Sequence, residues 1–194
     1  MKIVIINYGA GNIQSIKFAI QRLGHQAVLS NDEAEIRAAD KVIFPGVGEA
    51  SSAMQKLRDS GLDQVIPTLK QPVLGICLGM QLMCNASEEG NTEGLGIFDV
   101  DVVRFSNQLK VPQIGWNQIT DLKSPLFQEV ADNEHIYLVH SYYAPMVKET
   151  IAEAEYGVRY SAALHCNNFY GTQFHPEKSS TVGERILNNF LMMV

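Results

Sequence analysis

Apolar residues in the first half of the chain fall into short uninterrupted runs separated by polar turns. The first run, at residues 2–6, is rich in Ile and Val and is followed by a glycine-bearing loop. Continuous apolar runs of this length are typical of strands that are buried on both faces of a parallel sheet. The pattern therefore predicts a buried strand at residues 2–6 and further strands at residues 27–29, 41–44 and 72–76.

Helical spacing separates these runs. Residues 13–23 place apolar side chains on one face, and Gly24 follows as a stop signal. Asn31 or Asp32 is expected to cap a short helix, apolar residues near 54–62 indicate further helical segments, and another helix is expected to begin at about Cys77. Alternation of strands and helices predicts a parallel sheet with right-handed crossovers.

The pattern of predicted elements changes after residue 95, where strand-like runs follow one another with few helices between them. They lie at residues 100–105, 111–120, 135–139, 150–156, 161–166 and 169–174. This part predicts an antiparallel extension of the first sheet or a second sheet, closed by a last helix at about 182–193. With no repeat and no linker in the sequence, residues 1–194 are expected to form a single domain.

Composition and charge exclude several classes of function. Of the 194 residues, 46% are hydrophobic, and the net charge of −6 comes without any basic run, which argues against nucleic-acid binding. No stretch resembles a signal peptide or a membrane span, so a soluble cytoplasmic protein is expected. The three cysteines lack Cys-x-x-Cys spacing, which argues against a disulfide framework and against a zinc site.

A cysteine stands in a glycine-flanked turn at the end of the fourth predicted strand. The segment Gly75-Ile76-Cys77-Leu78-Gly79 has the form Gly-x-nucleophile-x-Gly, which forces a nucleophile into a sharp strand-to-helix turn. We expect the thiol to be exposed above the sheet edge. The start of the following helix favours a thiolate there, and the N–H of Leu78 is expected to face an oxyanion.

A structural cysteine in a tight turn remains the alternative interpretation of this segment. The other two cysteines are expected to be structural, Cys84 on the same side of the helix two turns beyond Cys77, and Cys166 within a strand.

A second chemical signal follows the last predicted strand. In an extended segment residues two apart point the same way, so His175 and Glu177 are expected to face the turn at Cys77 together, with Pro176 stiffening the link. A thiol, an imidazole and a carboxylate are the groups that acyl transfer through a thioester requires. A surface histidine beside a turn is the alternative. The remaining histidines are expected to be structural or to line a substrate wall: His25, His135, His140 and His165.

Two motifs together resemble the class I (triad) glutamine amidotransferases. They are Gly75-Ile76-Cys77-Leu78-Gly79-Met80-Gln81 and Gln173-Phe174-His175-Pro176-Glu177-Lys178-Ser179. Within that class the chain resembles the glutaminase subunits of imidazole glycerol phosphate synthases. The segments that carry this finer resemblance are Asn7–Asn12, Pro45–Gly48, Pro112–Asn117 and Val139–Tyr143. The resemblance implies a flavodoxin-like α/β fold whose central, mostly parallel sheet carries an antiparallel extension.

The resemblance also implies roles for individual residues. Catalysis falls to Cys77, His175 and Glu177, and the oxyanion is held by Leu78 and the strip Gly46, Val47 and Gly48. This strip is expected to be misaligned until a partner binds its own substrate. The glutamine head group is held by Gln81, Glu89, Ser141 and Tyr142. Apart from the resemblance, Glu89 in Ser87-Glu88-Glu89-Gly90 reads as a solvated acidic loop.

A partner is part of what the resemblance implies. The chain is expected to form a heterodimer with a cyclase subunit that is a (β/α)₈ barrel, with Asn12, Trp116, Tyr137 and Lys178 at the interface. Trp116 as a core anchor and Lys178 as a solvated side chain are the simpler interpretations. Neither a metal nor an organic cofactor is implied.

Three other functions compete with this hypothesis. In these alternatives the chain would be a glutaminase for another synthase, such as anthranilate or pyridoxal phosphate synthase, or a catalytically dead interaction subunit, or a cysteine peptidase on a related fold. The Asn7–Asn12 and Val139–Tyr143 segments argue against the first, and the intact Cys77, His175 and Glu177 argue against the second. A peptidase predicts peptide cleavage without glutamine dependence.

Overall fold

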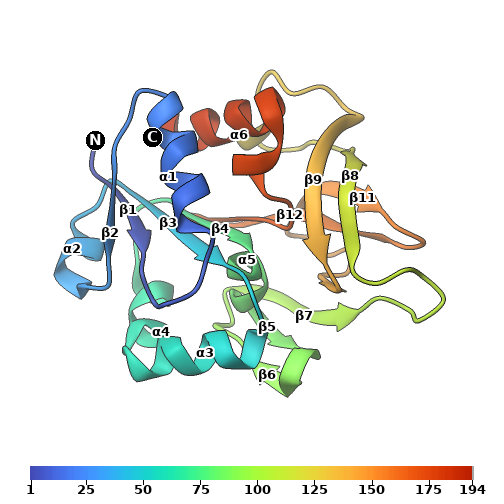
Figure 1. Ribbon diagram of the computed structural model, residues 1–194, viewed down its shortest axis with the longest axis horizontal. Helices are drawn as coiled ribbons and strands as arrows, with labels where there is room; N and C mark the ends of the chain where they lie inside the picture. Colours follow the sequence, from blue (N-terminus) through green and yellow to red (C-terminus); the bar gives the residue numbers. More distant parts are fainter. Residues whose placement is uncertain (194) are drawn as a thin grey trace.

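A seven-stranded sheet forms the centre of the molecule in the computed structural model, which describes residues 1–193 (Figure 1). The strand order is β11-β12-β13-β4-β3-β1-β2, and the run from β13 to β2 is parallel while β12 and β11 are antiparallel to their neighbours. This arrangement confirms the predicted fold class. The strands are β1 (Ile3–Ile6), β2 (Ala27–Ser30), β3 (Lys41–Gly46), β4 (Val73–Cys77), β11 (Thr150–Glu155), β12 (Arg159–Cys166) and β13 (Phe169–Thr172).

Successive residues of the central strands serve two separate cores. Ile3 and Ile5 of β1 belong to one hydrophobic cluster, whereas Val4 and Ile6 belong to the other. Residues of a strand point alternately to opposite faces, so a strand covered on both faces must be apolar throughout. The first cluster takes in buried residues of α1 and α6, and the second takes in those of α3 and α4.

The helices cover both faces of the sheet (Figure 1). They are α1 (Ile13–Arg22), α2 (Glu33–Arg37), α3 (Ala50–Asp59), α4 (Leu62–Val65), α5 (Leu78–Leu82) and α6 (Ser180–Met192). Side chains cap two of them: Asp32 accepts a hydrogen bond from the Glu35 N–H at 2.8 Å, and Glu49 accepts one from the Ser52 N–H at 2.9 Å. Of the two caps expected for α2, Asp32 is the one used. Short 3₁₀ helices are η1 (Ile66–Thr68), η2 (Glu89–Asn91), η3 (Pro125–Phe127) and η4 (Pro176–Lys178).

Two smaller sheets follow in the second half of the chain, beside the antiparallel extension. One has the order β10-β7-β5-β6, and the other is the antiparallel pair of β8 and β9. In Figure 1 this pair stands at the right of the view, apart from α1, α2 and α3. The bounds are β5 (Cys84–Ser87), β6 (Thr92–Glu93), β7 (Phe98–Arg104), β8 (Gln113–Ile119), β9 (Glu134–His140) and β10 (Tyr142–Tyr143).

The expected helix around Cys84 is wrong. Helix α5 ends at Leu82, and Cys84 begins β5. Backbone N–H groups of the segment 95–98 bind the carbonyls of Leu82, Met83 and Cys84 at 2.8–3.0 Å, so these carbonyls are taken by a distant part of the chain and the helix cannot continue. Cys84 is nevertheless buried, as expected of a structural thiol, and burial raises its pKa.

Within residues 1–193 the longest helix is too short and too polar to cross a lipid bilayer.

Candidate active site

Cys77 occupies a strained turn where β4 passes into α5. Its φ of 54° and ψ of −112° lie in a region that residues other than glycine rarely adopt. A Cβ on Gly75 would approach the Met83 Cε to 2.4 Å, and one on Gly79 would approach the Phe44 carbonyl oxygen to 2.0 Å. The two flanking glycines are therefore required by close packing, which is the reason anticipated from the sequence.

The thiol lies at the base of a pocket, and not exposed above the sheet as expected, because β9 passes over it. Cys77 is 7% exposed. Its Sγ lies 3.8 Å from the Val139 carbonyl oxygen, which accepts the S–H, and 3.8 Å from the Gln173 Nε2, which donates to the sulfur. Burial restricts the thiol to the small molecules that enter this pocket.

His175 and Glu177 form a buried pair beside the thiol. The His175 Nδ1 lies 2.9 Å from the Glu177 Oε1, with both side chains almost fully buried. Burial works to lower the pKa of His175, but hydrogen bonding to Cys77 and then to Glu177 outweighs it and raises that pKa to about 10. A raised pKa makes His175 a ready acceptor for the thiol proton.

The backbone that carries the pair differs from the expectation. Strand β13 ends at Thr172, and the residues from Pro176 form the 3₁₀ turn η4. The imidazole and the carboxylate therefore meet across a tight turn that begins with proline, and not by the two-residue period of a strand. The His175 N–H donates to the Tyr137 carbonyl at 2.9 Å, which fixes this turn to β9.

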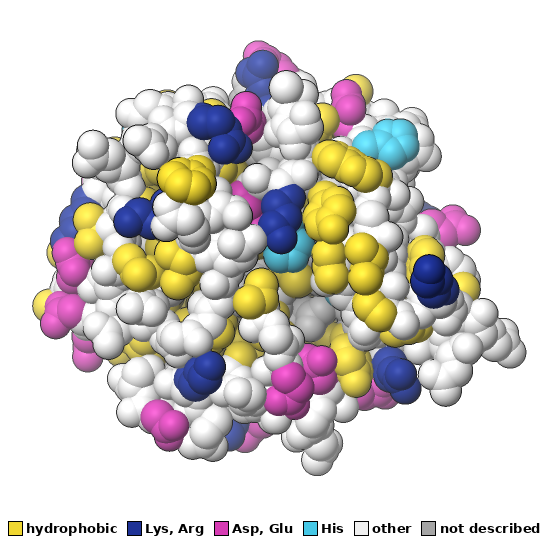
Figure 2. Space-filling model, viewed as in Figure 1, with side chains coloured by type: hydrophobic (Ala, Val, Ile, Leu, Met, Phe, Trp, Pro, Cys, Tyr) yellow, Lys and Arg dark blue, Asp and Glu magenta, His cyan; other side chains and the backbone are white. Residues whose placement is uncertain are grey.

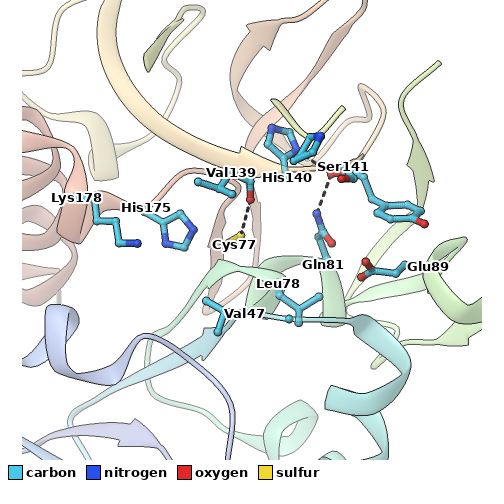
Figure 3. A pocket seen from close by; sticks show the side chains of 13 residues that line it. Val47, Cys77, Leu78, Gln81, Glu89, Val139, His140, Ser141, His175 and Lys178 are labelled. Carbon is cyan, nitrogen blue, oxygen red and sulfur yellow. Dashed lines mark hydrogen bonds between the residues drawn. The ribbon is translucent and has the colours of Figure 1, made fainter. Parts of the chain in front are cut away.

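A pocket of about 340 Å³ opens over Cys77, between the carboxyl ends of the parallel strands and β9. In Figure 3 His175 and Lys178 lie on one side of Cys77, while Gln81 and Glu89 lie on the other. The lining residues are Val47, Gly48, Cys77, Leu78, Gln81, Glu89, Pro112, Val139, His140, Ser141, Tyr142, His175 and Lys178. The carboxyl ends of parallel strands are the usual place for ligand sites in open α/β sheets.

Most of the residues singled out in the sequence meet in this pocket. Glu177 lies behind His175, on the side away from the pocket. Gly46 pairs with Cys77 across β3 and β4, and a Cβ on Gly46 would lie 2.4 Å from the Gly79 N. Sequence reasoning missed Pro112 and Val139, whose only signal was their place in the two segments of the finer resemblance.

His140 lines the pocket and also belongs to a buried polar network. It therefore takes both roles expected of the histidines other than His175, a structural role and a place in the substrate wall. Its Nδ1 lies 2.8 Å from the Tyr142 carbonyl oxygen, and its Nε2 lies 3.0 Å from the Gln113 side chain. Burial, with a smaller contribution from nearby His175, lowers the pKa of His140 to about 4. His140 is therefore a neutral scaffold at physiological pH.

The strip after β3 is anchored at both ends. The Tyr8 hydroxyl donates to the Pro45 carbonyl at 2.8 Å, and the Ala50 N–H that opens α3 donates to the Glu89 Oε2 at 2.9 Å. Between these anchors Val47 is 40% exposed, and Gly48 has a φ of +96°. Val47 and Gly48 therefore lie between two fixed points, at the mouth of the pocket.

Glu89 is not a freely solvated carboxylate. It lines the pocket with its carboxylate bound to the start of α3, and burial raises its pKa despite that hydrogen bond. A half-buried carboxylate with an unused oxygen suits a cationic group in the pocket.

The outer surface of β8 and β9 carries exposed apolar side chains beside the pocket. Ile114 is 63% exposed and Trp116 is 55% exposed, so Trp116 is not a core anchor. Trp116 pairs with Tyr137 across the two strands with ring centroids 5.9 Å apart, and the Lys178 Nζ lies 5.9 Å from the Tyr137 ring centroid. Figure 2 shows hydrophobic side chains gathered beside a hollow on this face.

Asn12 is placed differently from the other three interface candidates. It stands at the start of α1, where its Oδ1 accepts a hydrogen bond from the Ser15 hydroxyl at 3.0 Å.

Among residues 1–193 no group of three or more His, Cys, Asp or Glu side chains is arranged to hold a metal ion.

Comparisons with known proteins show the family to which the chain belongs. Residues 4–194 match the family described as glutamine amidotransferase class-I. A protein of Bacteroides fragilis named imidazole glycerol phosphate synthase subunit HisH is 57% identical, and the alignment covers 98% of this chain and 99% of that one. Proteins of the same name from Bacteroides thetaiotaomicron and Shewanella loihica are 54% and 44% identical, again over 98% of this chain and over 99% and 90% of theirs.

Solved structures share the fold at much lower identity. A glutamine amidotransferase crystal structure superposes with a TM-score of 0.76 at 18% identity, covering 97% of this chain and 96% of the other. Another, from Thermotoga maritima, gives a TM-score of 0.64 at 17% identity, covering 98% and 82%. The full-length family match and the high identity of the curated relatives together carry the assignment. The chain belongs to the class-I glutamine amidotransferase family and, within it, to the HisH group.

Proposed function

We propose that this chain, acting as a single domain over residues 1–194, is the glutaminase subunit of an imidazole glycerol phosphate synthase. It hydrolyses glutamine to glutamate and ammonia through a thioester on Cys77. The observation that carries this proposal is the strained Cys77 turn facing the buried His175–Glu177 pair inside one pocket. The names of relatives up to 57% identical supply the pathway.

Formation of the thioester begins with proton transfer from Cys77 to His175. The thiolate attacks the side-chain carboxamide carbon of glutamine, and the carbonyl π electrons move onto oxygen. The backbone N–H groups of Leu78 and of the strip at Val47 and Gly48 hold this oxyanion. As the tetrahedral intermediate collapses, the C–N bond breaks and His175 returns the proton to the departing nitrogen, which leaves as ammonia.

Hydrolysis of the thioester uses the same groups. His175, now neutral, takes a proton from water as the water oxygen attacks the thioester carbon. Collapse of the second tetrahedral intermediate breaks the C–S bond, the thiolate recovers a proton, and glutamate leaves. Glu177 stabilises the imidazolium in both stages and keeps its Nδ1 protonated, through the 2.9 Å contact.

The far wall of the pocket suits the amino-acid end of glutamine. The Gln81 Nε2 is already engaged by protein acceptors, so its Oε1 remains for the substrate ammonium, and Glu89 supplies the negative charge. Backbone groups at Ser141 and Tyr142 are proposed to bind the substrate carboxylate.

Ammonia has to reach a second active site before it is protonated in water. We propose that a cyclase subunit, a (β/α)₈ barrel, docks over the pocket as a heterodimer and makes imidazole glycerol phosphate and an aminoimidazole carboxamide ribotide in histidine biosynthesis. The exposed Trp116 and Lys178 and the half-buried Tyr137 beside the pocket support this site of docking, and Asn12 is proposed to join them. Exposed aromatic side chains beside a pocket are typical of interface anchors.

The decisive experiment measures glutamate release from glutamine by the purified chain, alone and with a cyclase subunit and its ribonucleotide ligand. Strong activation only in the complex supports the amidotransferase reaction, the cyclase partner, and an oxyanion strip that becomes aligned on docking. Cys77→Ser should abolish release, whereas Cys166→Ser, which alters a thiol outside the pocket, should not.

Other outcomes would change the proposal. Activity that the partner leaves unchanged would keep the Cys77 chemistry and reject the gating. A folded chain that is inactive in both conditions would indicate the dead subunit. Alkylation of Cys77 by a reactive glutamine analogue separates that case from a wrong choice of partner.

A further inference from the structure

Gln173 is a buried amide that directly faces the nucleophile. It lies two residues before His175, between the end of β13 and η4, and its side chain is fully buried. Its Nε2 lies 3.8 Å from the Cys77 Sγ, and its Oε1 lies 2.8 Å from the Gln81 Nε2. Gln173 thus connects the sulfur to a residue of the proposed substrate wall.

A backbone carbonyl determines which end of the Gln173 amide faces the sulfur. The Tyr142 carbonyl oxygen lies 2.9 Å from the Gln81 side chain, and a carbonyl only accepts, so Gln81 must present its NH₂ group there. The second hydrogen of that NH₂ group then points to Gln173, which must answer with its oxygen. The Gln173 NH₂ group is left facing Cys77, so the direction of each hydrogen bond follows from donor and acceptor chemistry.

Rotation of the amide is prevented by its surroundings. The Gln173 N–H donates to the Ala162 carbonyl at 2.8 Å, which anchors the backbone in the sheet. Reversing the side chain would place its oxygen beside the sulfur and its NH₂ group against the NH₂ group of Gln81. A buried donor pair without an acceptor costs about 1–3 kcal/mol for each unsatisfied group.

The remaining groups around the sulfur divide into those that favour the thiol and those that favour the thiolate. The Val139 carbonyl oxygen, 3.8 Å away, accepts from a thiol and repels a thiolate. Burial, and further the nearby Cys77, raise the pKa of Tyr8, so its hydroxyl stays protonated and donates a hydrogen bond to the Pro45 carbonyl. His175 is the titratable group that accepts the thiol proton. The Gln173 side-chain NH₂ group is a neutral donor that points at the negative charge left on the sulfur.

We propose that Gln173 is a further catalytic residue, whose side-chain N–H stabilises the Cys77 thiolate in a direction fixed by Gln81 and the Tyr142 carbonyl. The inference deepens the proposed function, because it takes Cys77 as the nucleophile. The same hydrogen bonds hold the Gln81 oxygen toward the substrate, so one chain of amides orients both the substrate wall and the nucleophile.

The test is the rate of Cys77 alkylation by iodoacetamide between pH 5 and 10, followed by mass spectrometry of the Cys77 peptide in a Cys166→Ser background. Gln173→Glu keeps the oxygen that accepts from Gln81 and replaces the donor by an acidic group. We expect its alkylation at pH 7 to fall by about tenfold or more and its rate profile to move to higher pH, since a hydrogen bond to a charged acceptor is lost and a like charge is added.

A second variant covers the case in which a buried acid prevents folding. Gln173→Met has a similar size and no donor, and its alkylation should slow by about threefold to tenfold. Gln71→Glu is the matched control: the Gln71 Nε2 donates to the Ile36 carbonyl at 2.8 Å before the opposite end of β4, so the same chemical change there should leave the profile in place.

Unchanged profiles in a folded Gln173→Glu or Gln173→Met protein would overturn the role of Gln173. The proposed function fails by a different measurement, when the wild-type complex releases no glutamate from glutamine.

Discussion

Replacing Glu177 by Gln should lower the pKa of His175. The Glu177 carboxylate is fully buried and contacts the imidazole at 2.9 Å, while its Oε2 has no hydrogen-bond partner among the described residues. With the charge centres about 4 Å apart and an effective dielectric constant of about 20, their attraction is about 4 kcal/mol, or about 3 pKa units. The amide keeps the shape of the side chain and removes this attraction, so the pKa of His175 should fall below its value of about 10, while the larger contribution of Cys77 remains.

The raised pKa has a consequence for stability as well. Protonation of His175 stabilises the folded chain, and this contribution is complete below about pH 6.5 and is lost as the pH rises through about 10. In Glu177→Gln the loss should occur at lower pH, so urea unfolding midpoints of the two proteins should follow different pH dependences between pH 7 and 10.

The assay is a titration of the imidazole protons of His175 by NMR, in a Cys77→Ser background. This background removes the contribution of the thiol from both midpoints, so their difference reports the effect of Glu177 alone. The chain has five histidines, and a His175→Gln spectrum assigns the signal. Glu184→Gln, on α6 and paired with Arg22, is the matched control and should leave the His175 titration in place. A difference of less than one pH unit between the midpoints with and without Glu177 would refute the electrostatic reasoning. Glutamine turnover in the complex should also fall, by about a hundredfold to ten-thousandfold.

Three further predictions follow from the site and its surroundings. Gly79→Ala should lower stability by about 3 kcal/mol or more in urea unfolding, because its Cβ would lie 2.0 Å from the Phe44 carbonyl oxygen. Gly48→Ala, whose Cβ would meet open space, adds only the backbone strain of a φ of +96° and should cost less; equal losses would contradict this explanation. Glu89→Gln should raise the KM for glutamine about tenfold with little change in kcat, because it removes charge from the substrate wall, and an unchanged KM would remove Glu89 from that wall. Trp116→Ala should weaken binding of the cyclase subunit by about 2–4 kcal/mol in calorimetry without lowering the melting temperature, since Trp116 is 55% exposed; normal affinity would place the interface elsewhere.

The parallel half of the fold can be predicted from the sequence because each strand carries its own signal. The uninterrupted apolar runs at β1, β3 and β4 correspond to strands buried on both faces, and the 3.6-residue period of α1 corresponds to a single buried face. The later strands are also recognisable, but their distribution over three sheets is not, because strand pairing is set by long-range contacts that leave no local pattern.

The site shows the same division between local and distant information. The turn at Cys77 follows from two glycines beside it, and these glycines are explained by contacts with Phe44 and Met83 that lie elsewhere in the chain. The early end of α5 depends on residues 95–98, which bind the helix carbonyls from a separate segment. The burial of the thiol depends on Val139 of β9. None of these distant partners can be inferred from the residues near Cys77 alone.

The role proposed for Gln173 illustrates a further limit. Its position beside His175 is visible in the sequence, but the orientation of its amide follows from Tyr142 and Gln81, which are remote in the chain. Hydrogen-bond direction is a property of the assembled network.

The place of β13 in the sheet has a consequence for how the protein is made. This strand lies between β4 and β12, so β4 has no neighbour on one side until residues near 170 have been synthesised and docked. During translation the fully apolar strand Val73–Cys77 therefore presents an unpaired edge, which is a template for association with other chains. Newly made chains should depend on chaperones during this interval, and fragments that stop before β13 should aggregate rather than persist as soluble, partly active enzyme.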